Sequence, residues 1–374
     1  MVSVSLCMIV KNEEDVLERC LESAAELVDE IIIVDTGSTD RTKEIAARFT
    51  GQIYDFPWRD DFAAARNESF SHASMDYCMW LDADDVLLEE DQTSFLALKE
   101  SLDPSVSVVM APYHTGFDES GRVTFSYYRE RLIKNRAGMS WAGAVHEAVT
   151  PVGTVLYGDF AVTHRKTRPS DPDRNLRIYQ TQLDTGKELE PRQQFYYGRE
   201  LYYHHSWEEA LAVLERFLEE GRGWVENNID ACCHCAYCHK ELGHDQAALA
   251  ALFRAFAYDR PRAEVCCDIG LWFFQREQYR QAAYWYALAL TCTRDDRRGG
   301  FVSPDCYGYL PCIQMCVCYS RLGDRKKAEA FNELAAACKP DSPAVLHNRA
   351  VFQSLPEQTA ARHGMPHAHH QGQP

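Results

Sequence analysis

The sequence lacks the glycine-rich loops of two large classes of nucleotide-binding protein. The first predicted strand, residues 2–10, is followed by Lys11-Asn12-Glu13-Glu14 and not by Gly-x-Gly-x-x-Gly. This absence argues against a dinucleotide site. The P-loop pattern Gly-x-x-x-x-Gly-Lys-Ser/Thr is also missing, which argues against a P-loop NTPase. A sugar nucleotidyltransferase would need a glycine-rich loop at the same place, so this class is disfavoured too.

Positive charge is scarce as well. The 374 residues include 39 Lys and Arg against 56 Asp and Glu, which gives a formal net charge of −17. Nucleic acids and anionic membranes attract basic patches, so we expect neither as the main partner. No stretch of about 18 apolar residues exists, so we expect no membrane span. Residues 1–6 have no basic region and no cleavage site, so we expect no signal peptide.

Cysteine is abundant and unevenly distributed. The chain has 15 cysteines, three in the first half (Cys7, Cys20 and Cys78) and the other twelve from Cys232 onward. Without an export signal, so many thiols favour a reducing compartment, and we expect a cytoplasmic protein. The uneven distribution indicates that the two halves of the chain differ in structure.

The first half alternates strand and helix patterns. Short apolar or β-branched runs are separated by residues at helical spacing, which is typical of parallel βαβ units. Strands are expected at 2–10, 30–34, 51–54 and 77–81, and helices at 16–27, 41–49 and 62–73, the last capped by Asp60. Polar loops follow three of the strands, at 11–14, 35–40 and 82–85. Because parallel strands end at one edge of a sheet, these loops should lie together.

Three carboxylates in four residues, Asp82, Asp84 and Asp85, follow the apolar run 77–81. Acids at a strand end can hold a hard divalent cation, and the cation can hold a diphosphate. The alternative is an acidic helix cap, because Glu89-Glu90-Asp91 follow. The triplet alone leaves both interpretations open.

Four motifs, taken together, resemble glycosyltransferase family 2, which has the GT-A fold. They are IVKNEE at 9–14, IIIVDTGSTDRT at 31–42, DFAAARNESF at 61–70 and WLDADD at 80–85. Their order and spacing are more specific than any one of them. The chain is most similar to bacterial members with a helical-repeat tail, the sublancin-type peptide S-glycosyltransferases. The resemblance covers about residues 1–180 strongly.

The resemblance implies an inverting transferase that uses a nucleoside-diphosphate sugar, UDP-linked, with Mn²⁺ or Mg²⁺. It implies that Asp35 and Arg66 contact the nucleotide. It further implies that Asp82 contacts the ribose and Asp84 the cation, with Asp82 a second candidate metal ligand. We expect Asp85 to cap the following helix and not to bind metal.

Two further loops supply candidates for the donor site. Lys11 and Glu13 flank the first loop and are candidate nucleotide contacts. His164 lies at a position where the family has a histidine facing metal and diphosphate. Lys166 and Arg168 lie in a loop rich in Pro and Asp, and they could clamp phosphate when the loop closes.

Residues 139–147, MSWAGAVHE, resemble the family pattern WxGxVHE. An inverting transferase needs a carboxylate that accepts the proton of the acceptor, and Glu147 is the candidate base. His146 has three possible roles: metal ligand, phosphate donor or structural residue. Trp141 either offers a face to a sugar ring or packs in the core.

The second half shows a helical repeat. Equivalent alanines at Ala210, Ala248, Ala282 and Ala328 are 38, 34 and 46 residues apart, which resembles tetratricopeptide repeats. Such a stack either binds a partner, a homodimer included, or braces the catalytic domain. The stretch 232–238 has Cys-x-x-Cys spacing, but it lies where the repeat requires a helix. Cysteine packs there as a small apolar residue, so core packing is preferred over metal.

We therefore expect an α/β GT-A catalytic domain with a mixed sheet and an all-α repeat domain. The expected divisions are 1–170 (catalytic), 171–192 (linker helix), 193–354 (repeats) and 355–374 (disordered His-rich tail). The expected acceptor is a Cys, Ser or Thr side chain of a peptide or protein. A glycan or small-molecule acceptor and an inactive peptide-binding adaptor are the alternatives. The sequence identifies neither the sugar nor the acceptor atom.

Overall fold

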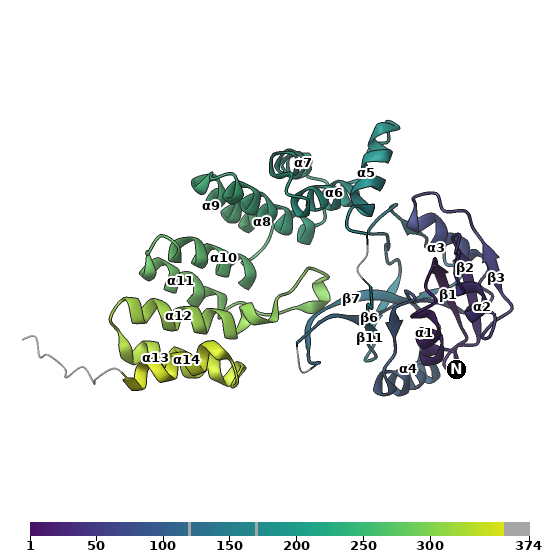
Figure 1. The fold of residues 1–374 in the computed structure, drawn as a ribbon, viewed down its shortest axis with the longest axis horizontal. Coiled ribbons are helices and arrows are strands. Elements are labelled where there is room, and N and C mark those ends of the chain that lie inside the picture. The colour runs from purple at the N-terminus through teal and green to yellow at the C-terminus, as the bar shows by residue number, and fades with distance from the viewer. Residues whose placement is uncertain (119–120, 169–170, 355–374) are drawn as a thin grey trace, which may run out of the picture.

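The computed structural model describes residues 1–118, 121–168 and 171–354. It shows a domain built on a mixed sheet, followed by a long array of helices (Figure 1). The predicted fold class is therefore confirmed. The expected disordered tail, 355–374, and residues 169–170 at the expected domain boundary lie outside the described residues.

The main sheet has the strand order β3-β2-β1-β4-β7-β6-β11-β5, with β10 beside β6. Its members are β1 (Val4–Val10), β2 (Glu30–Asp35), β3 (Ile53–Asp55), β4 (Tyr77–Trp80), β5 (Asp85–Val86), β6 (Val106–Phe117), β7 (Val123–Lys134), β10 (Thr154–Tyr157) and β11 (Val162–His164). Strands β1 to β4 are mutually parallel, as predicted, whereas β7 joins β4 and β6 in antiparallel register. A small separate sheet pairs β8 (Trp141–Ala142) with β9 (Ala148–Val149).

Helices cover both faces of the parallel strands. They are α1 (Leu17–Ala24), α2 (Thr42–Ala46), α3 (Phe62–Ser71) and α4 (Glu89–Ser101). Leu6 and Met8 of β1 share a core with α1 and α4, while Cys7 packs on the opposite face with residues near α3. Because both faces are buried, β1 is apolar except for Ser5 and does not alternate regularly with polar residues.

The ends of the parallel strands meet at one edge of the sheet. Val10 of β1 pairs with Asp35 of β2, and Cys7 pairs with Trp80 of β4. The loops that follow these strands therefore lie side by side, as the sequence predicts.

Three local predictions are corrected. Asp61, and not Asp60, caps α3, because its Oδ1 accepts a hydrogen bond from the backbone N–H of Ala64. The helix expected at 41–49 is reduced to α2. Asp85 does not cap α4, which begins after Leu88 without a side-chain cap. Asp85 instead lies in β5, which pairs with β11. The pairing of β5 with β11 joins segments far apart in the chain, so no local sequence pattern indicates it.

The second half is entirely helical in its described part. Its helices are α5 (Arg174–Asp184), α6 (Pro191–Tyr203), α7 (Trp207–Glu220), α8 (Val225–Glu241), α9 (Asp245–Arg254), α10 (Ala263–Phe274), α11 (Tyr279–Ala289), α12 (Tyr309–Arg321), α13 (Arg325–Cys338) and α14 (Pro343–Ser354). The predicted division at residue 192 falls inside α6.

Helices α6 to α13 form consecutive hairpins, and the aligned alanines mark the second helix of each. Ala210, Ala248, Ala282 and Ala328 lie in α7, α9, α11 and α13, and all four are buried. A small side chain at this position lets paired helices approach closely. The repeat predicted from the spacing is therefore confirmed.

The cysteines at 232–238 pack inside α8, with Cys232, Cys235 and Cys238 buried among neighbouring helices. Burial raises the pKa of the Cys232 thiol to about 12 and that of Cys238 to about 11, so both stay protonated near neutral pH. They belong to no cluster with metal-ligand spacing among the described side chains. Core packing, as preferred from the sequence, is what the structure shows.

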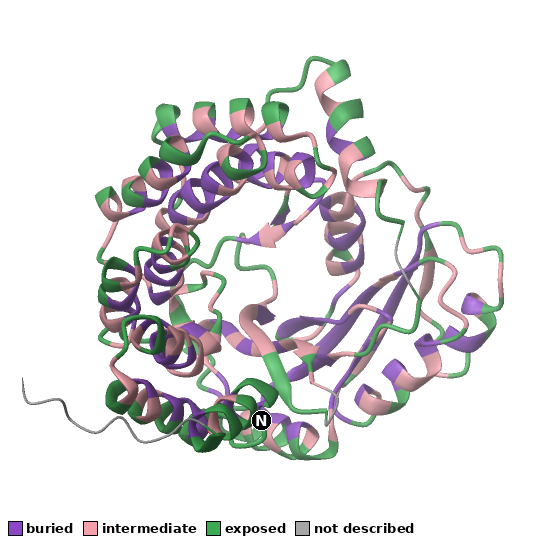
Figure 2. Cartoon of the chain, turned by 60° about the vertical axis from the view of Figure 1, so that its left-hand side comes forward, coloured by how far each residue is buried: buried purple, intermediate pink, exposed green. Residues whose placement is uncertain are grey.

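The helical array curves back toward the sheet domain (Figure 2). The connection between α11 and α12 contacts the sheet: Phe301 lies 6.0 Å from the Tyr127 ring, and Tyr157 Oη donates to the carbonyl of Arg297 at 2.9 Å. A second contact zone joins α6 to the loop between β8 and β9. In the described ranges, no helix is both long and apolar enough to cross a membrane.

The contact between α10 and α11 provides a test of the repeat packing. A Cβ on Gly270 would lie 2.9 Å from the ring of Tyr286, which is buried and cannot move aside. We expect Gly270→Ala to destabilise the protein by about 1–3 kcal/mol through overpacking, although alanine favours helix. Thermal melting followed by circular dichroism measures this. Gly51→Ala, with open space around its Cβ, is the control. Equal melting temperatures for both variants would contradict the packing.

Candidate functional site

A cavity of about 690 Å³ lies at the edge where the parallel strands end. Its walls come from segments that include the loop after β1, α3, the acids after β4, β7, the loop between β8 and β9, and the segment from His164 into α5. Lys11, Glu13, Arg66, Asp82, Asp84, His146, Glu147, His164 and Lys166 all line it. Nine of the predicted site residues are thus brought together by segments far apart in the chain.

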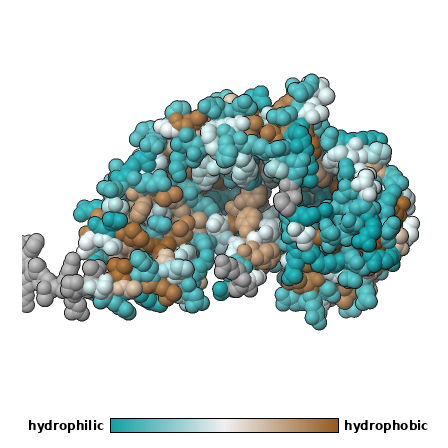
Figure 3. All heavy atoms as spheres, viewed as in Figure 1, coloured by the Kyte–Doolittle hydropathy of each residue, from teal (hydrophilic) through white to brown (hydrophobic). Residues whose placement is uncertain are grey.

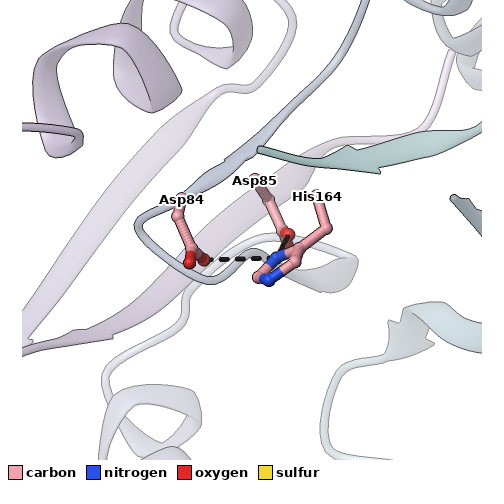
Figure 4. Close-up of side chains that lie close together, drawn as sticks. All are labelled: Asp84, Asp85 and His164. Carbon is pink, nitrogen blue, oxygen red and sulfur yellow. Dashed lines mark hydrogen bonds and ion pairs between the residues drawn. The ribbon is translucent and has the colours of Figure 1, made fainter. Parts of the chain in front are cut away.

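Asp84, Asp85 and His164 form the cluster best suited to a cation (Figure 4). One ligand atom from each lies within 4.8 Å of the others, and the described residues contain no second such group. His164 Nδ1 lies 3.4 Å from Asp84 Oδ1 and 3.1 Å from Asp85 Oδ1. Carboxylate oxygens suit Mg²⁺ and Mn²⁺, so this donor set fits such an ion.

Asp85 orients the cluster from beneath. Its side chain is 0% exposed, and it accepts hydrogen bonds from Tyr113 Oη at 2.8 Å and from the Asp82 N–H at 3.0 Å. Because His164 Nδ1 is directed at Asp84 and Asp85, Nε2 would be the ring nitrogen left for an ion. A carboxylate that fixes the ring of a metal-binding histidine in this way is a common outer-shell feature. Asp85 therefore orients the His164 ring, whereas the sequence predicted that it would cap the following helix.

The electrostatics of Asp84 also suit a cation. Burial raises the pKa of Asp84, and the charges of Asp82 and Asp85 raise it further, although His164 opposes them. A positive ion would relieve the repulsion among these acids. Burial lowers the pKa of His164, but its hydrogen bond to Asp85 and the nearby acids outweigh burial, and the pKa is raised.

Arg66 joins the acids to the candidate base. Its Nη2 lies 2.7 Å from Asp82 Oδ1, and its Nε lies 2.7 Å from Glu147 Oε1. The side chain is only 6% exposed and lies over the Trp80 ring at 4.4 Å. Burial by itself raises the pKa of Asp82, but the Arg66 charge outweighs it and the pKa is lowered. Asp82 is thus directed at Arg66 and not at the Asp84–Asp85–His164 cluster.

Two buried polar atoms at this edge have no hydrogen-bond partner within the described ranges: Arg66 Nη1 and Asp35 Oδ2. Asp35 Oδ1 accepts from the N–H groups of Gly37 and Ser38. Asp35 itself does not line the cavity, but the adjacent Thr36 does. A polar ligand such as a nucleotide would satisfy unpaired atoms of this kind.

The first loop and the later basic loop meet across the cavity. Arg168 Nη2 lies 3.1 Å from Glu13 Oε2 and donates to the Asn12 carbonyl at 2.6 Å. Burial raises the pKa of Glu13, and the charges of Asp84 and Asp82 add to this while Arg168 opposes it. Arg168 thereby holds the loop after β11 over the loop after β1, and Lys166 lines the cavity between them.

Trp141 does not offer a face to a sugar. It is 3% exposed and packs edge-on against Trp80 at 5.2 Å and Phe70 at 5.8 Å. Its alternative role, core packing, is the correct one. The aromatic residues that line the cavity are instead Trp80 and two that the sequence did not single out, Trp58 and Phe62.

Phe62 could have been found from the motif at 61–70. It stands four residues before Arg66 in α3, so both side chains share one face of the helix. Arg174 lies over the Phe62 ring at 4.8 Å and also lines the cavity. Arg129, another lining residue that the sequence did not single out, comes from β7, and no local pattern marks it.

Comparison with known proteins agrees with this geometry. Residues 5–150 match the profile "Glycosyl transferase family 2". A TPR repeat-containing protein of Synechococcus elongatus is 38% identical over 149 residues, covering 40% of this chain and 36% of that protein. The SPbeta prophage-derived glycosyltransferase SunS of Bacillus subtilis is 27% identical over 235 residues, covering 58% of this chain and 53% of SunS.

A lipopolysaccharide core biosynthesis glycosyltransferase of Rhizobium meliloti, LpsC, is 30% identical over 162 residues, covering 41% of this chain and 58% of LpsC. The matches span about a third to somewhat more than half of the length of these curated relatives. The profile, the mixed sheet and the repeated helix pairs agree with one another. Residues 5–150 therefore form a domain that matches glycosyltransferase family 2, and paired helices repeat through the described residues that follow it.

Proposed function

We propose that the protein is an inverting glycosyltransferase that uses a UDP-linked sugar and a divalent cation, Mn²⁺ or Mg²⁺. One observation carries the proposal: Arg66 places Asp82, beside the candidate cation cluster, and Glu147 in a single cavity. In a glycosyl transfer, the donor diphosphate lies beside the cation and the acceptor lies beside the base, so both groups must border the same cavity. The free cysteines support action in a reducing, cytoplasmic compartment.

The residues divide into a donor side and an acceptor side. Asp84 and His164 would hold the cation, which neutralises charge on a leaving nucleoside diphosphate. Asp35 and Arg66, with their unpaired polar atoms, would bind the nucleotide, and Lys11, Glu13 and Lys166 border the same space. Because Arg66 holds Oε1 of Glu147, Oε2 is the oxygen left to accept the proton of the acceptor. Attack from the side opposite the leaving group inverts the anomeric carbon.

The acceptor is proposed to be a Cys, Ser or Thr side chain of a peptide or protein. The space-filling view shows a recess between the helices and the sheet domain, and stacked helix pairs offer an extended surface along such a recess (Figure 3). A glycan acceptor is the second candidate, favoured by the similarity to LpsC. Mass spectrometry of peptide and oligosaccharide products, formed from a panel of UDP-sugars, separates the two.

If the protein were an inactive peptide-binding adaptor, it would not be expected to bind a nucleotide sugar. We expect at least one UDP-sugar, with Mn²⁺, to raise the melting temperature of the protein, because a ligand that binds only the folded state stabilises it. Failure of every nucleotide sugar in the panel to shift the melting temperature would favour the adaptor.

The cation assignment is tested at Asp84. We expect Asp84→Asn to weaken Mn²⁺ binding, measured by electron paramagnetic resonance in the presence of UDP, by about tenfold or more. Asp84 lies 3.4 Å from the His164 ring and lines the cavity, so this change removes one candidate carboxylate ligand. Glu100→Gln, an exposed acid of α4, is the control and should bind Mn²⁺ as the unaltered protein does. Unchanged Mn²⁺ affinity in Asp84→Asn would refute the site.

The base is tested at Glu147. The isosteric change Glu147→Gln should leave UDP affinity within about twofold but lower turnover of the UDP-sugar by about a hundredfold or more, the usual contribution of a general base. Calorimetry gives the affinity and release of UDP gives the turnover. If turnover persists, another carboxylate accepts the proton.

A further inference from the structure

The loop that carries Glu147 contains a backbone conformation that histidine rarely adopts. His146, directly before Glu147, has a φ of 50°, in the left-handed region. A non-glycine residue there costs on the order of 1 kcal/mol and persists only where surrounding contacts hold it. The contacts that hold the backbone of His146 therefore also fix the position of the Glu147 backbone.

Three of those contacts come from one face of α6. His146 Nε2 donates to Glu200 Oε1 at 2.8 Å, and its ring stacks on Tyr196 at 4.2 Å with an angle of 16°. Arg192 Nε donates to the carbonyl of His146 at 3.2 Å. Positions 192, 196 and 200 are four residues apart, so they lie along one stripe of the helix.

Glu200 is itself held in place. It is largely buried, and Asn175 of α5 donates to the same Oε1 at 3.0 Å. Burial raises the pKa of Glu200, but hydrogen bonds from His146 and Asn175 outweigh it and the pKa is lowered. Glu200 is therefore charged at neutral pH and accepts the hydrogen bond from the His146 ring.

The sheet holds Glu147 from the opposite side. Arg129 Nη2 donates to the Glu147 carbonyl at 3.3 Å, and Arg66 binds the carboxylate. On the α3 side, the N–H of Phe62 donates to Ala144 within the same loop. The loop between β8 and β9 is thus clamped between the sheet domain and the first helix of the repeats.

We propose that α6, through Glu200, Tyr196 and Arg192, is a positioning element that sets the geometry of the base Glu147. The inference rests on the proposed function, in which Glu147 accepts the acceptor's proton. It gives the repeat domain a part in building the active site, beyond bracing or partner binding. Because the sheet domain supplies Glu147 and α6 supplies its support, the active site is complete only when α6 packs against the loop between β8 and β9.

The test compares Glu200→Ala with Glu200→Gln. The alanine variant loses the acceptor for His146, whereas the glutamine variant keeps a side-chain oxygen. We expect Glu200→Ala to lower kcat for hydrolysis of a UDP-sugar by about tenfold or more, since small misplacements of a catalytic group are costly. The affinity for UDP with Mn²⁺ should stay within about twofold, and Glu200→Gln should recover much of kcat. Glu209→Ala, an exposed acid of α7, is the control.

A second pair of variants separates positioning from general stability. Asparagine tolerates the left-handed region and its amide can donate to Glu200, whereas alanine does neither. We therefore expect His146→Asn to keep a higher kcat than His146→Ala, with both retaining UDP affinity. Equal kcat in the two variants, or a kcat of Glu200→Ala equal to that of the control, would overturn the inference.

A crystal structure of Glu200→Ala tests the same point without activity. We expect residue 146 to leave the left-handed region and the Glu147–Arg66 contact to lengthen from 2.7 Å. An unchanged φ of His146 and an unchanged contact would overturn the positioning role. Absence of UDP-sugar binding by the unaltered protein would instead overturn the proposed function, so the two failures are distinguishable.

Discussion

The buried guanidinium of Arg66 is the interaction on which the candidate site depends. It pairs with Asp82 at the end of β4 and with Glu147 in the loop between β8 and β9, and it lies over Trp80 and Trp141. Removing the partner of a buried charge typically costs about 3–5 kcal/mol, and this applies to the Arg66–Glu147 pair, because the Asp82 side chain is 37% exposed. One side chain thus ties the two halves of the cavity together and keeps two carboxylates apart.

Nearby arginine charges also offset the repulsion among Asp82, Asp84 and Asp85, which lie within four residues of one another. Arg131, fully buried, lies over Trp80 at 3.9 Å and donates to the Trp80 carbonyl at 3.1 Å, with Asp85 at 3.5 Å. Asp82 is balanced by Arg66, so Asp84 is the acid left facing the cavity without a nearby guanidinium among the described residues. The acids of one short loop thereby take different roles: pairing with arginine, orienting histidine and facing the ligand.

Much of this arrangement could be predicted from local patterns. Periodicity and spacing predict the parallel strands of the first half, the shared edge of the three loops and the repeat marked by Ala210 and Ala248. Asp85 and Trp141 could not be placed that way, because their environments come from distant segments: Asp85 meets His164 across 79 residues. The support of His146 by Glu200 was hidden for the same reason, since two domains must fold before it exists.

The proposed role of this cavity is to hold a nucleotide together with a divalent cation between Asp84 and His164. The most direct measurement is an anomalous difference map from a crystal grown with UDP and Mn²⁺. We expect a manganese peak within coordination distance of an Asp84 oxygen and His164 Nε2, with diphosphate beside it. A manganese peak elsewhere, or UDP bound outside this cavity, would contradict it.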